Sequence, residues 1–387
     1  MSRRLGVSGR SAICAIVTAI ALLIGFVPGC SLMRPHHHPY TTSAATPLPT
    51  PTPIPTPTPT ARATPALPLG ATAAAPTGPA PFAIALGPDR NIWFTQFRSS
   101  RIGRITPLGE VKIYDLSSGG LPERLTAGPD NAIWFTDPAG NRIGRLDASG
   151  STVYVPLPTP DSGAAAITSA PDGNLWFTEH KANRIGRVTP LGTVTEYVLP
   201  NGGGPAGIAP GVDGDLYFAE NRAARIDRIT PDGRVDEFAL PNSSAVPNGV
   251  VIGPDHNIWF TELSGRKVGR LTPGGDTTEF ALPVDGRPLG IAAGSDGNIW
   301  VTIPSEHALC QIGADGHSSA FFLPATVIPT FLTSGSDGNL WFTEPTGKIG
   351  RFSTTGFLTE FSAAETVQPA PPTAEPAANR QLLIGPH

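Results

Sequence analysis

The stretch Asn174-Leu175-Trp176-Phe177-Thr178-Glu179 decides the fold, because close copies of it recur through most of the chain. Its aromatic centre falls at seven positions that are 41 or 42 residues apart and include all six tryptophans: Trp93, Trp134, Trp176, Tyr217, Trp259, Trp300 and Trp341. A period of that length, with an aromatic marker in each copy, is typical of a β-propeller with one four-stranded blade per repeat. The sequence therefore predicts an all-β protein: a seven-bladed β-propeller with four antiparallel strands per blade, over residues 81–362.

Each repeat divides into four short strands, as the fifth repeat illustrates. Its strands are expected at 247–252, 257–262, 267–271 and 277–282, with Gly, Pro and Asp in the intervening turns. The second strand is apolar on both faces, so both faces must be covered, as they are when blades stack against each other.

The two ends of the repeat region favour a closed ring. The first and last repeats keep the apolar pattern, whereas the end repeats of an open solenoid are polar. The chain enters on a first strand near Phe82 and leaves on a fourth strand near Phe361. No blade borrows a strand from the other terminus, so closure is expected to rest on packing between blades alone.

The composition limits the classes of partner. The chain has 27 basic and 31 acidic residues and a formal net charge of −4, with no basic run inside the repeats, which argues against nucleic acid. We expect a monomer whose partner is a small molecule, or an extracellular protein or peptide.

The N-terminal segment, residues 1–30, reads as an export signal. Arginines precede an apolar run from Ala12 to Val27, which is short for a membrane span. The run ends in Val27-Pro28-Gly29-Cys30, which resembles a bacterial lipobox, so Cys30 is the expected lipidation site. Ordinary secretion and an uncleaved anchor are the alternatives. The protein is therefore expected on the extracytoplasmic side, held to the membrane only by this anchor.

Two further segments lack the composition needed for a core. Residues 31–80 are rich in Pro and Thr and predict an extended, semi-rigid tether. Residues 363–387 contain repeated prolines and predict a disordered tail.

Polar positions also recur in the repeats. An Asp stands in the turn before each second strand and is interpreted as a turn cap: Asp89, Asp130, Asp172, Asp213, Asp255, Asp296 and Asp337. A carboxylate ends most second strands, at Asp137, Glu179, Glu220, Glu262 and Glu344. A base follows across the hairpin, at Arg101, Arg142, Arg184, Arg225, Lys267 and Lys348, whereas the sixth repeat has Ile303 and Leu309.

The joint absence in the sixth repeat favours acid–base pairing within each blade, and the alternative is a ring of acids around one mouth of the central channel. A second set of bases is expected to link neighbouring blades: Arg104, Arg145, Arg187, Arg228, Arg270 and Arg351.

The repeat resembles a known family. Residues 173–179, followed by Asn183–Pro190 and Thr193–Pro200, are similar to the repeats of the virginiamycin B lyase (streptogramin lyase) family, and the likeness covers residues 81–361. The resemblance implies a seven-bladed propeller that uses Mg²⁺ to open a cyclic depsipeptide antibiotic by elimination at its ester bond. In the family a histidine is the general base and the metal holds the enolate-like charge.

The resemblance also places the family's functional residues on this chain. The ring of first-strand positions reads Phe82, Glu123, Ala165, Ala206, Asn248, Leu289 and Thr330. A substrate-binding Tyr corresponds to Phe82, and two histidines correspond to Leu289 and Thr330, the second being the catalytic one. The two metal carboxylates correspond to Ile328 and Pro345. Neither Thr nor Leu accepts a proton at neutral pH, and neither Ile nor Pro binds Mg²⁺ through its side chain.

Other polar residues are expected near the same mouth. Glu123 lies in the first-strand ring and His180 follows a second strand, so the two could form an acid–base pair, and Glu123 or Glu179 could contact a metal. Two hypotheses follow. The first is a lipid-anchored ligand-binding or scaffold propeller whose mouth carries Phe82, Glu123, His180 and Asn248. The second is an enzyme, either a Mg²⁺-dependent carbon–oxygen lyase or a different activity at this mouth.

Overall fold

The computed structural model describes residues 80–96, 99–116 and 119–365. The chain divides into two units, 1–70 and 71–387, and every described residue belongs to the second. The predicted export signal, Cys30 and nearly all of the tether and tail lie outside the described residues. Within those residues, no helix is both long enough and apolar enough to cross a membrane.

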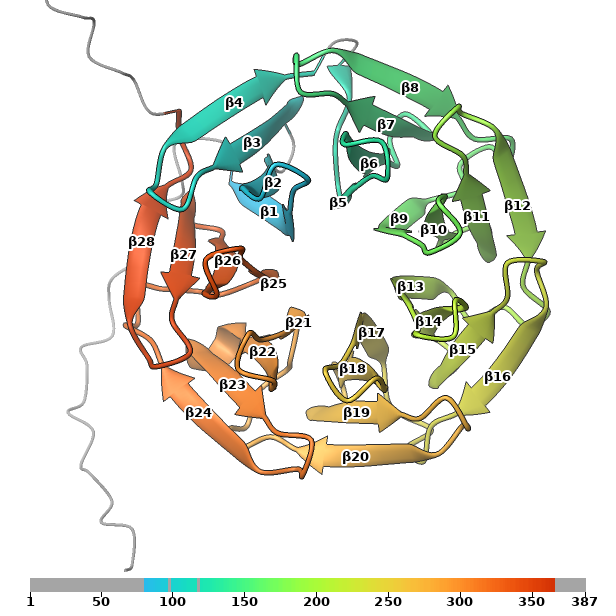
Figure 1. The fold of residues 1–387 in the computed structure, drawn as a ribbon. Helices are drawn as coiled ribbons and strands as arrows, with labels where there is room; N and C mark the ends of the chain where they lie inside the picture. Colours follow the sequence, from blue (N-terminus) through green and yellow to red (C-terminus); the bar gives the residue numbers. More distant parts are fainter. Residues whose placement is uncertain (1–79, 97–98, 117–118, 366–387) are drawn as a thin grey trace, which may run out of the picture. The chain divides into compact units, whose positions relative to one another are not determined.

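The described chain forms seven four-stranded antiparallel sheets arranged as blades around a ring (Figure 1), which confirms the predicted fold. The innermost strands are β1 (Pro81–Leu86), β5 (Leu125–Ala127), β9 (Ala164–Ser169), β13 (Pro205–Pro210), β17 (Pro247–Ile252), β21 (Ile291–Ala293) and β25 (Leu332–Ser334). The second strands are β2 (Ile92–Gln96), β6 (Ile133–Asp137), β10 (Leu175–Glu179), β14 (Leu216–Glu220), β18 (Ile258–Glu262), β22 (Ile299–Ile303) and β26 (Leu340–Glu344).

The third strands are β3 (Arg101–Ile105), β7 (Arg142–Leu146), β11 (Arg184–Val188), β15 (Arg225–Ile229), β19 (Lys267–Leu271), β23 (Ala308–Ile312) and β27 (Lys348–Phe352). The outermost strands are β4 (Val111–Asp115), β8 (Thr152–Pro156), β12 (Val194–Val198), β16 (Val235–Ala239), β20 (Thr277–Ala281), β24 (Ser318–Phe322) and β28 (Leu358–Ser362). A 3-10 turn, η2 (Pro304–Glu306), joins β22 to β23.

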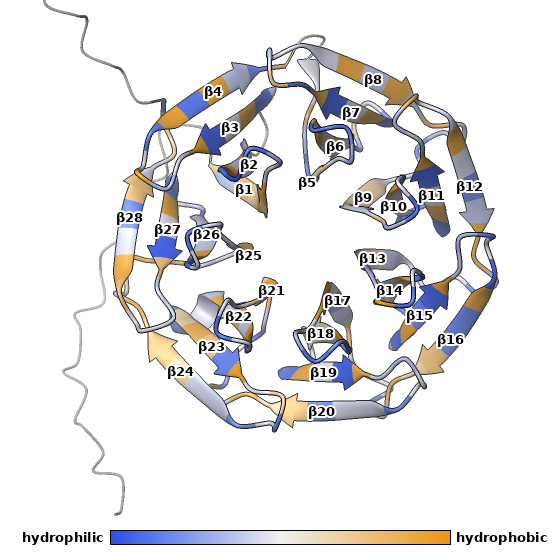
Figure 2. Ribbon diagram, viewed as in Figure 1, coloured by the Kyte–Doolittle hydropathy of each residue, from blue (hydrophilic) through white to orange (hydrophobic). Residues whose placement is uncertain are grey.

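Burial follows the layers of each blade. All five residues of every second strand are buried, as their two-faced apolar sequence predicts. The outermost strands mix partly buried and exposed residues, and Figure 2 shows polar and apolar residues interspersed along them. The second strands are therefore the centre of the core.

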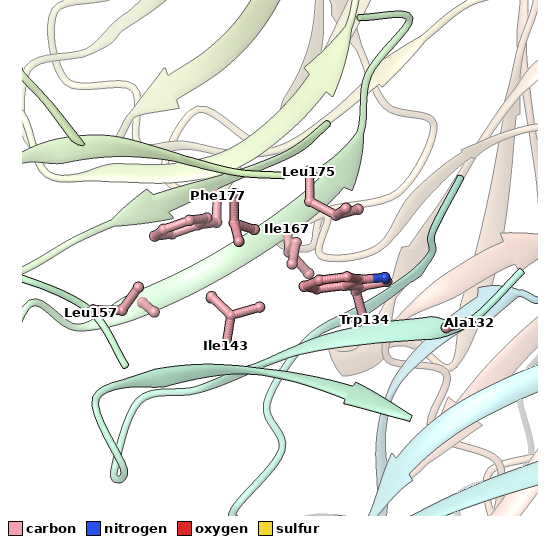
Figure 3. Packing of buried hydrophobic residues seen from close by; sticks show 9 residues of the cluster. Ala132, Trp134, Ile143, Leu157, Ile167, Leu175 and Phe177 are labelled. Carbon is pink, nitrogen blue, oxygen red and sulfur yellow. The ribbon is translucent and has the colours of Figure 1, made fainter. Parts of the chain in front are cut away.

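The tryptophans form the contacts between blades. Trp134 lies with Ile143 of its own blade against Ile167, Leu175 and Phe177 of the next blade (Figure 3). Equivalent clusters join the other neighbouring blades around the ring. The aromatic residues therefore bury apolar surface at every junction between blades.

The turn aspartates cap their turns and also bind the marker aromatics. In every blade the indole N–H, or the Tyr217 hydroxyl, donates to the turn carboxylate, at 2.7 to 3.1 Å. The Asp89, Asp172, Asp255, Asp296 and Asp337 carboxylates also accept from the backbone two residues later. The predicted turn role is confirmed. The bond to the buried N–H, which the sequence analysis did not anticipate, explains why an Asp recurs with each aromatic.

The third strand needs a small residue over the second-strand Phe. A Cβ added at Gly144 would lie 2.0 Å from Cζ of Phe135, and the equivalent glycines in four other blades are as tightly placed. The position holds Cys310 in the sixth blade and Asp227 in the fourth. Cys310 is fully buried with a free thiol, whose pKa burial raises to about 12.

Hydrogen bonds close to the channel link neighbouring blades at five junctions. The Thr at the fourth position of a second strand donates to a first-strand carbonyl of the next blade, as in Thr95 to Glu123 (3.0 Å) and Thr178 to Ala206 (2.8 Å). The last blade continues the series, since Thr343 donates to the carbonyl of Phe82 at 2.7 Å. The prediction that closure rests on packing alone is therefore wrong, because polar bonds also cross the junction.

Other polar contacts strengthen this junction. Gln96 Nε2 donates to the carbonyl of Ala363 at 3.2 Å, so the packed region continues one residue beyond the predicted end of the propeller. Arg351 donates to the carbonyl of Pro107 in the first blade at 2.8 Å. Arg187 and Arg270 make the same bond to their next blades, which confirms the predicted linking role for three of the six arginines.

Candidate functional site

A cavity of about 510 Å³ lies where the first strands begin, a size typical of small-molecule sites. The first-strand ring contributes Glu123, Ala165, Ala206, Asn248 and Leu289 to its wall. The hairpins after the second strands contribute His180 and Asn221. The structure therefore brings Glu123, His180 and Asn248 to one cavity, as the sequence analysis expected.

His180 is fixed in position by two hydrogen bonds. Its Nδ1 lies 3.1 Å from the carbonyl oxygen of Pro205, and its Nε2 lies 3.0 Å from a guanidinium nitrogen of Arg222. The tautomer with the proton on Nδ1 satisfies both contacts, because Nδ1 then donates to the carbonyl and Nε2 accepts from Arg222. The ring is thus oriented by its neighbours, and neither nitrogen is left over for a metal.

Glu123 carries a carboxyl group with no hydrogen bond or ion pair to any described residue. Burial raises the pKa of this carboxyl, an effect that the nearby charges of Arg124 and His180 partly offset. A carboxyl group with a raised pKa in a cavity can bind a cationic or hydrogen-bonding group of a ligand, and it is a candidate acid or base.

The remaining residues that the resemblance singled out are apolar or are engaged in contacts within the fold. Leu289 lines the cavity, whereas the Thr330 hydroxyl lies 2.7 Å from the carbonyl oxygen of Thr343. Ile328 is half-buried and Pro345 is exposed. Phe82 packs edge-on against Phe331, with ring centroids 4.8 Å apart, and is not part of the cavity wall.

The acids that end the second strands do not surround the mouth. Glu179, Glu220, Glu262 and Glu344 are fully buried and Asp137 nearly so, and none of them lines the cavity. They lie beside the segment that connects the preceding blade to their own blade. In the second blade, for example, the Leu121 N–H between β4 and β5 donates to the Asp137 carboxylate at 3.2 Å. Glu179 is accordingly placed away from the cavity.

The predicted pairing of these acids with the base across the hairpin occurs in two blades. Arg142 binds Asp137 at 2.7 Å, and Arg225 binds Glu220. In the first, third, fifth and seventh blades the base instead forms an ion pair with an acid on the fourth strand: Arg101–Asp115, Arg184–Glu196, Lys267–Glu279 and Lys348–Glu360. In the sixth blade the residue opposite Ile303 is Ala308, one position before the predicted Leu309.

The unpaired buried acids are held in an unusual environment. The pKa values of Glu179, Glu262 and Glu344 are each raised to about 7, first by burial and then by a fourth-strand glutamate: Glu196, Glu279 and Glu360 respectively. A carboxyl with a raised pKa in the folded state favours folding while it is protonated, and that contribution is lost as the pH rises through 7.

The melting temperature should therefore be higher at pH 5.5 than at pH 8.5. Each of the three carboxyls should contribute on the order of 1 kcal/mol to this difference, since Arg184, Lys267 and Lys348 lie nearby. Gln96 occupies the same position in the first blade, so the chain tolerates an amide there. Thermal unfolding of the E179Q/E262Q/E344Q variant should show a flatter pH profile, and an unchanged profile would contradict this assignment.

The fold and the cavity define a seven-bladed β-propeller with its candidate site at the mouth of the central channel. The model of the virginiamycin B lyase family matches residues 69–204 and 200–377. The chain belongs to this family.

Similar solved structures are consistent with this membership. A streptogramin B lyase is 35% identical with a TM-score of 0.68, covering 73% of this chain and 95% of that one. The virginiamycin B lyase from Staphylococcus aureus is 34% identical with a TM-score of 0.67, covering 70% and 94%. A catalytically inactive variant of the Staphylococcus aureus enzyme, solved with quinupristin, matches equally well. Among curated proteins, no sequence matches the chain.

The residues that the resemblance places at the family's metal positions do not fit Mg²⁺. This ion requires oxygen ligands in near-octahedral geometry, and the corresponding side chains are Ile328 and Pro345. Across the described residues, no three His, Cys, Asp or Glu side chains come together in a way that could hold a metal. We therefore derive no chemical step from a bound metal.

The sequence analysis missed three polar residues of the cavity wall: Arg124, Lys181 and Asn221. Arg124 directly follows the ring position Glu123, so extending the ring by one residue would have identified it. Lys181 and Asn221 follow His180 and Glu220 in hairpins, where the repeat pattern alone does not indicate which side chains reach the mouth.

Proposed function

We propose that this chain is a ligand-binding propeller that holds a small molecule or a short peptide segment in the cavity at its mouth. The observation that carries the proposal is the convergence of Glu123, His180 and Asn248 on a cavity of about 510 Å³. Apolar walls with a few fixed polar groups are typical of small-molecule sites. The resemblance places Thr330 where the family has the histidine that acts as base, and this supports binding over catalysis.

We also propose that the propeller works outside the cytoplasm, anchored through a lipid on Cys30. Support comes from the sequence alone: the apolar run at 12–27, the Val27-Pro28-Gly29-Cys30 motif and the Pro/Thr-rich segment at 31–80. Mass spectrometry of the mature N-terminus tests this part. A diacylated Cys30 supports it, and an unmodified Cys30 or another cleavage site rejects it.

Filling the cavity tests the binding function. Ala206 lies in the cavity wall, so Ala206→Trp should abolish binding of any ligand found by screening the isolated propeller. Ala314→Trp is the matched control, because Ala314 is exposed in a hairpin between β23 and β24, away from the cavity. Calorimetric titration should show binding to the wild type and to the control only. Equal binding by the Ala206→Trp variant would reject the cavity as the site.

The second candidate function is a lyase that opens cyclic depsipeptides. It is favoured by 35% identity to a streptogramin B lyase over 95% of that chain and by the Glu123 carboxyl in the cavity. Incubation with a streptogramin B antibiotic and Mg²⁺, followed by mass spectrometry, distinguishes the two. We expect no linear product, because Leu289 and Thr330 cannot accept a proton. A linear product that disappears in Glu123→Gln would establish an enzyme with a relocated base.

A further inference from the structure

Arg124 directly follows the ring position Glu123, and it differs from most residues that follow a ring position in the other blades. The residue after each ring position is small in five blades: Ala83, Ala166, Gly207, Gly249 and Gly290. Space there is limited, since a Cβ on Gly207 would lie 2.2 Å from the carbonyl oxygen of Asn248. Only Arg124 and Phe331 have large side chains at this position. Both residues line the cavity.

The guanidinium of Arg124 lies over two aromatic rings. Its Cζ lies 3.7 Å from the centroid of Phe331 and 5.2 Å from that of Phe82. The two rings come from the seventh and first blades, so the arginine of the second blade extends past the small Ala83. A cation–π contact of this kind positions the guanidinium but uses none of its N–H groups as hydrogen-bond donors to oxygen.

No described residue uses these N–H groups. Among the hydrogen bonds and ion pairs of the described chain, none involves the Arg124 guanidinium. Its backbone alone is bonded, since the N–H donates to Thr136 Oγ1 at 3.1 Å and the carbonyl accepts from the Thr136 N–H at 3.0 Å. The neighbouring bases are engaged, because Lys181 pairs with Asp161 at 2.7 Å and Arg222 bonds His180. Burial lowers the pKa of Arg124 to about 10, so the group is still charged at neutral pH. A partly desolvated cation with unused donors favours an anionic partner.

We propose that Arg124 is the anchor of an anion subsite, and that the ligand of this cavity carries a single carboxylate on an apolar body. A carboxylate matches the fork of donors on a guanidinium bidentately. Glu123 lies in the same wall and would repel a multiply charged group such as a polyphosphate. Ile84, Ile208, Val250 and Ile291 provide apolar walls for the rest of the ligand. The inference rests on the proposed binding function and deepens it.

The test compares matched probes by calorimetric titration against the isolated propeller. N-acetyl-phenylalanine carries the carboxylate, and N-acetyl-phenylalaninamide differs only in lacking it. The wild type should bind the acid at least tenfold more tightly than the amide, as expected of a charge-assisted hydrogen-bond pair. A pentapeptide ending in phenylalanine, with a free or an amidated carboxy-terminus, shows whether a free organic acid or a peptide end is preferred.

Two variants assign the effect to Arg124. Arg124→Gln should reduce acid affinity to that of the amide, while Arg124→Lys, which keeps the charge, should retain part of it. Arg266→Gln is the control, because Arg266 is an exposed base in the hairpin between β18 and β19 and, among the described residues, its ion pair is with Asp285. It should bind the acid as the wild type does. Thermal unfolding of each variant confirms that it is folded.

A readout on the wild type does not depend on any variant. Adding N-acetyl-phenylalanine should shift the Nε–H resonance of Arg124, and adding the amide should not.

Each outcome decides the proposal. Equal affinity for acid and amide, or unchanged acid binding by Arg124→Gln, overturns the anion subsite but leaves the binding function standing. Failure of every probe to bind overturns the inferred ligand class. The binding function is then tested separately, by the ligand screen and the comparison of the wild type with Ala206→Trp.

Discussion

Replacing Trp134 with alanine is expected to lower the free energy of unfolding by about 3–5 kcal/mol. The indole is fully buried between the second and third blades, where it contacts Ile167, Leu175 and Phe177 (Figure 3). Its removal leaves a cavity at a junction that both neighbouring blades share. The Asp130 carboxylate keeps its bond to Arg145 at 2.5 Å, so the loss is mainly one of packing. Chemical denaturation monitored by circular dichroism measures the effect.

The chain itself offers a control for this substitution. Tyr217 occupies the same position in the fourth blade, and its hydroxyl donates to Asp213 at 2.7 Å. Trp134→Tyr should therefore keep most of the aromatic packing and the polar bond, and it should cost about 1–2 kcal/mol. A cost for Trp134→Ala no larger than that for Trp134→Tyr would mean that the blades are not held together through the indoles.

Replacing Arg225 with methionine should destabilise the fourth blade by about 3–5 kcal/mol at neutral pH. The Arg225 guanidinium binds Glu220, and its nitrogens lie 3.1 Å from an Asp227 carboxylate oxygen and 3.2 Å from one of Glu237. Glu220 and Asp227 are fully buried. Burial, followed by the charge of Glu220, already raises the pKa of Asp227 to about 8, so loss of the cation leaves acids with no compensating charge.

The pH dependence of this loss is a second readout. An acid with a raised pKa stabilises the folded state when protonated, so the penalty in Arg225→Met should shrink as the pH falls below 7. Lys267→Met is the matched control, since Lys267 binds one acid, Glu279, and is partly exposed. It should cost no more than about 1 kcal/mol. Equal unfolding free energies for the two variants would contradict the role given to Arg225.

The double variant R225M/D227G extends this argument. Glycine is the residue at the Asp227 position in five of the other blades, where it packs over the second-strand Phe. Removing Asp227 together with Arg225 should therefore recover much of the lost stability.

Much of the fold could be predicted because the repeat encodes it redundantly. The aromatic marker, the turn residues and the doubly apolar second strand each indicate the same blade, and in the fifth repeat β17 and β19 begin and end at the predicted residues. The pairing of acids and bases was harder to predict. Lys267 pairs with Glu262 in one ladder and with Ala281 in the other, yet its side chain binds Glu279, which lies two residues from Ala281. Side-chain length and burial, not sequence spacing, decide which acid it binds.

The sequence could predict which residues lie at the ring positions of the candidate site, but not how their side chains pack. The register placed Glu123, Asn248 and Leu289 at one mouth, and the structure confirms this placement. It could not show that the Phe82 ring packs on Phe331, because that contact depends on which residue the neighbouring seventh blade presents. The contact of Arg124 with Phe82 and Phe331 could not be predicted for the same reason.

Gln96 pairs with Pro81 in the β1–β2 ladder, and its side chain also bonds Ala363, so the beginning and the end of the packed chain meet at a single residue. Every blade is built from one uninterrupted segment, and the hydrogen bond from Thr343 to Phe82 is of the same type as those between consecutive blades. The junction between the seventh and first blades is consequently built like the junctions between consecutive blades. A circular permutant whose new ends fall between any two blades would contain the same set of blades and the same set of junctions.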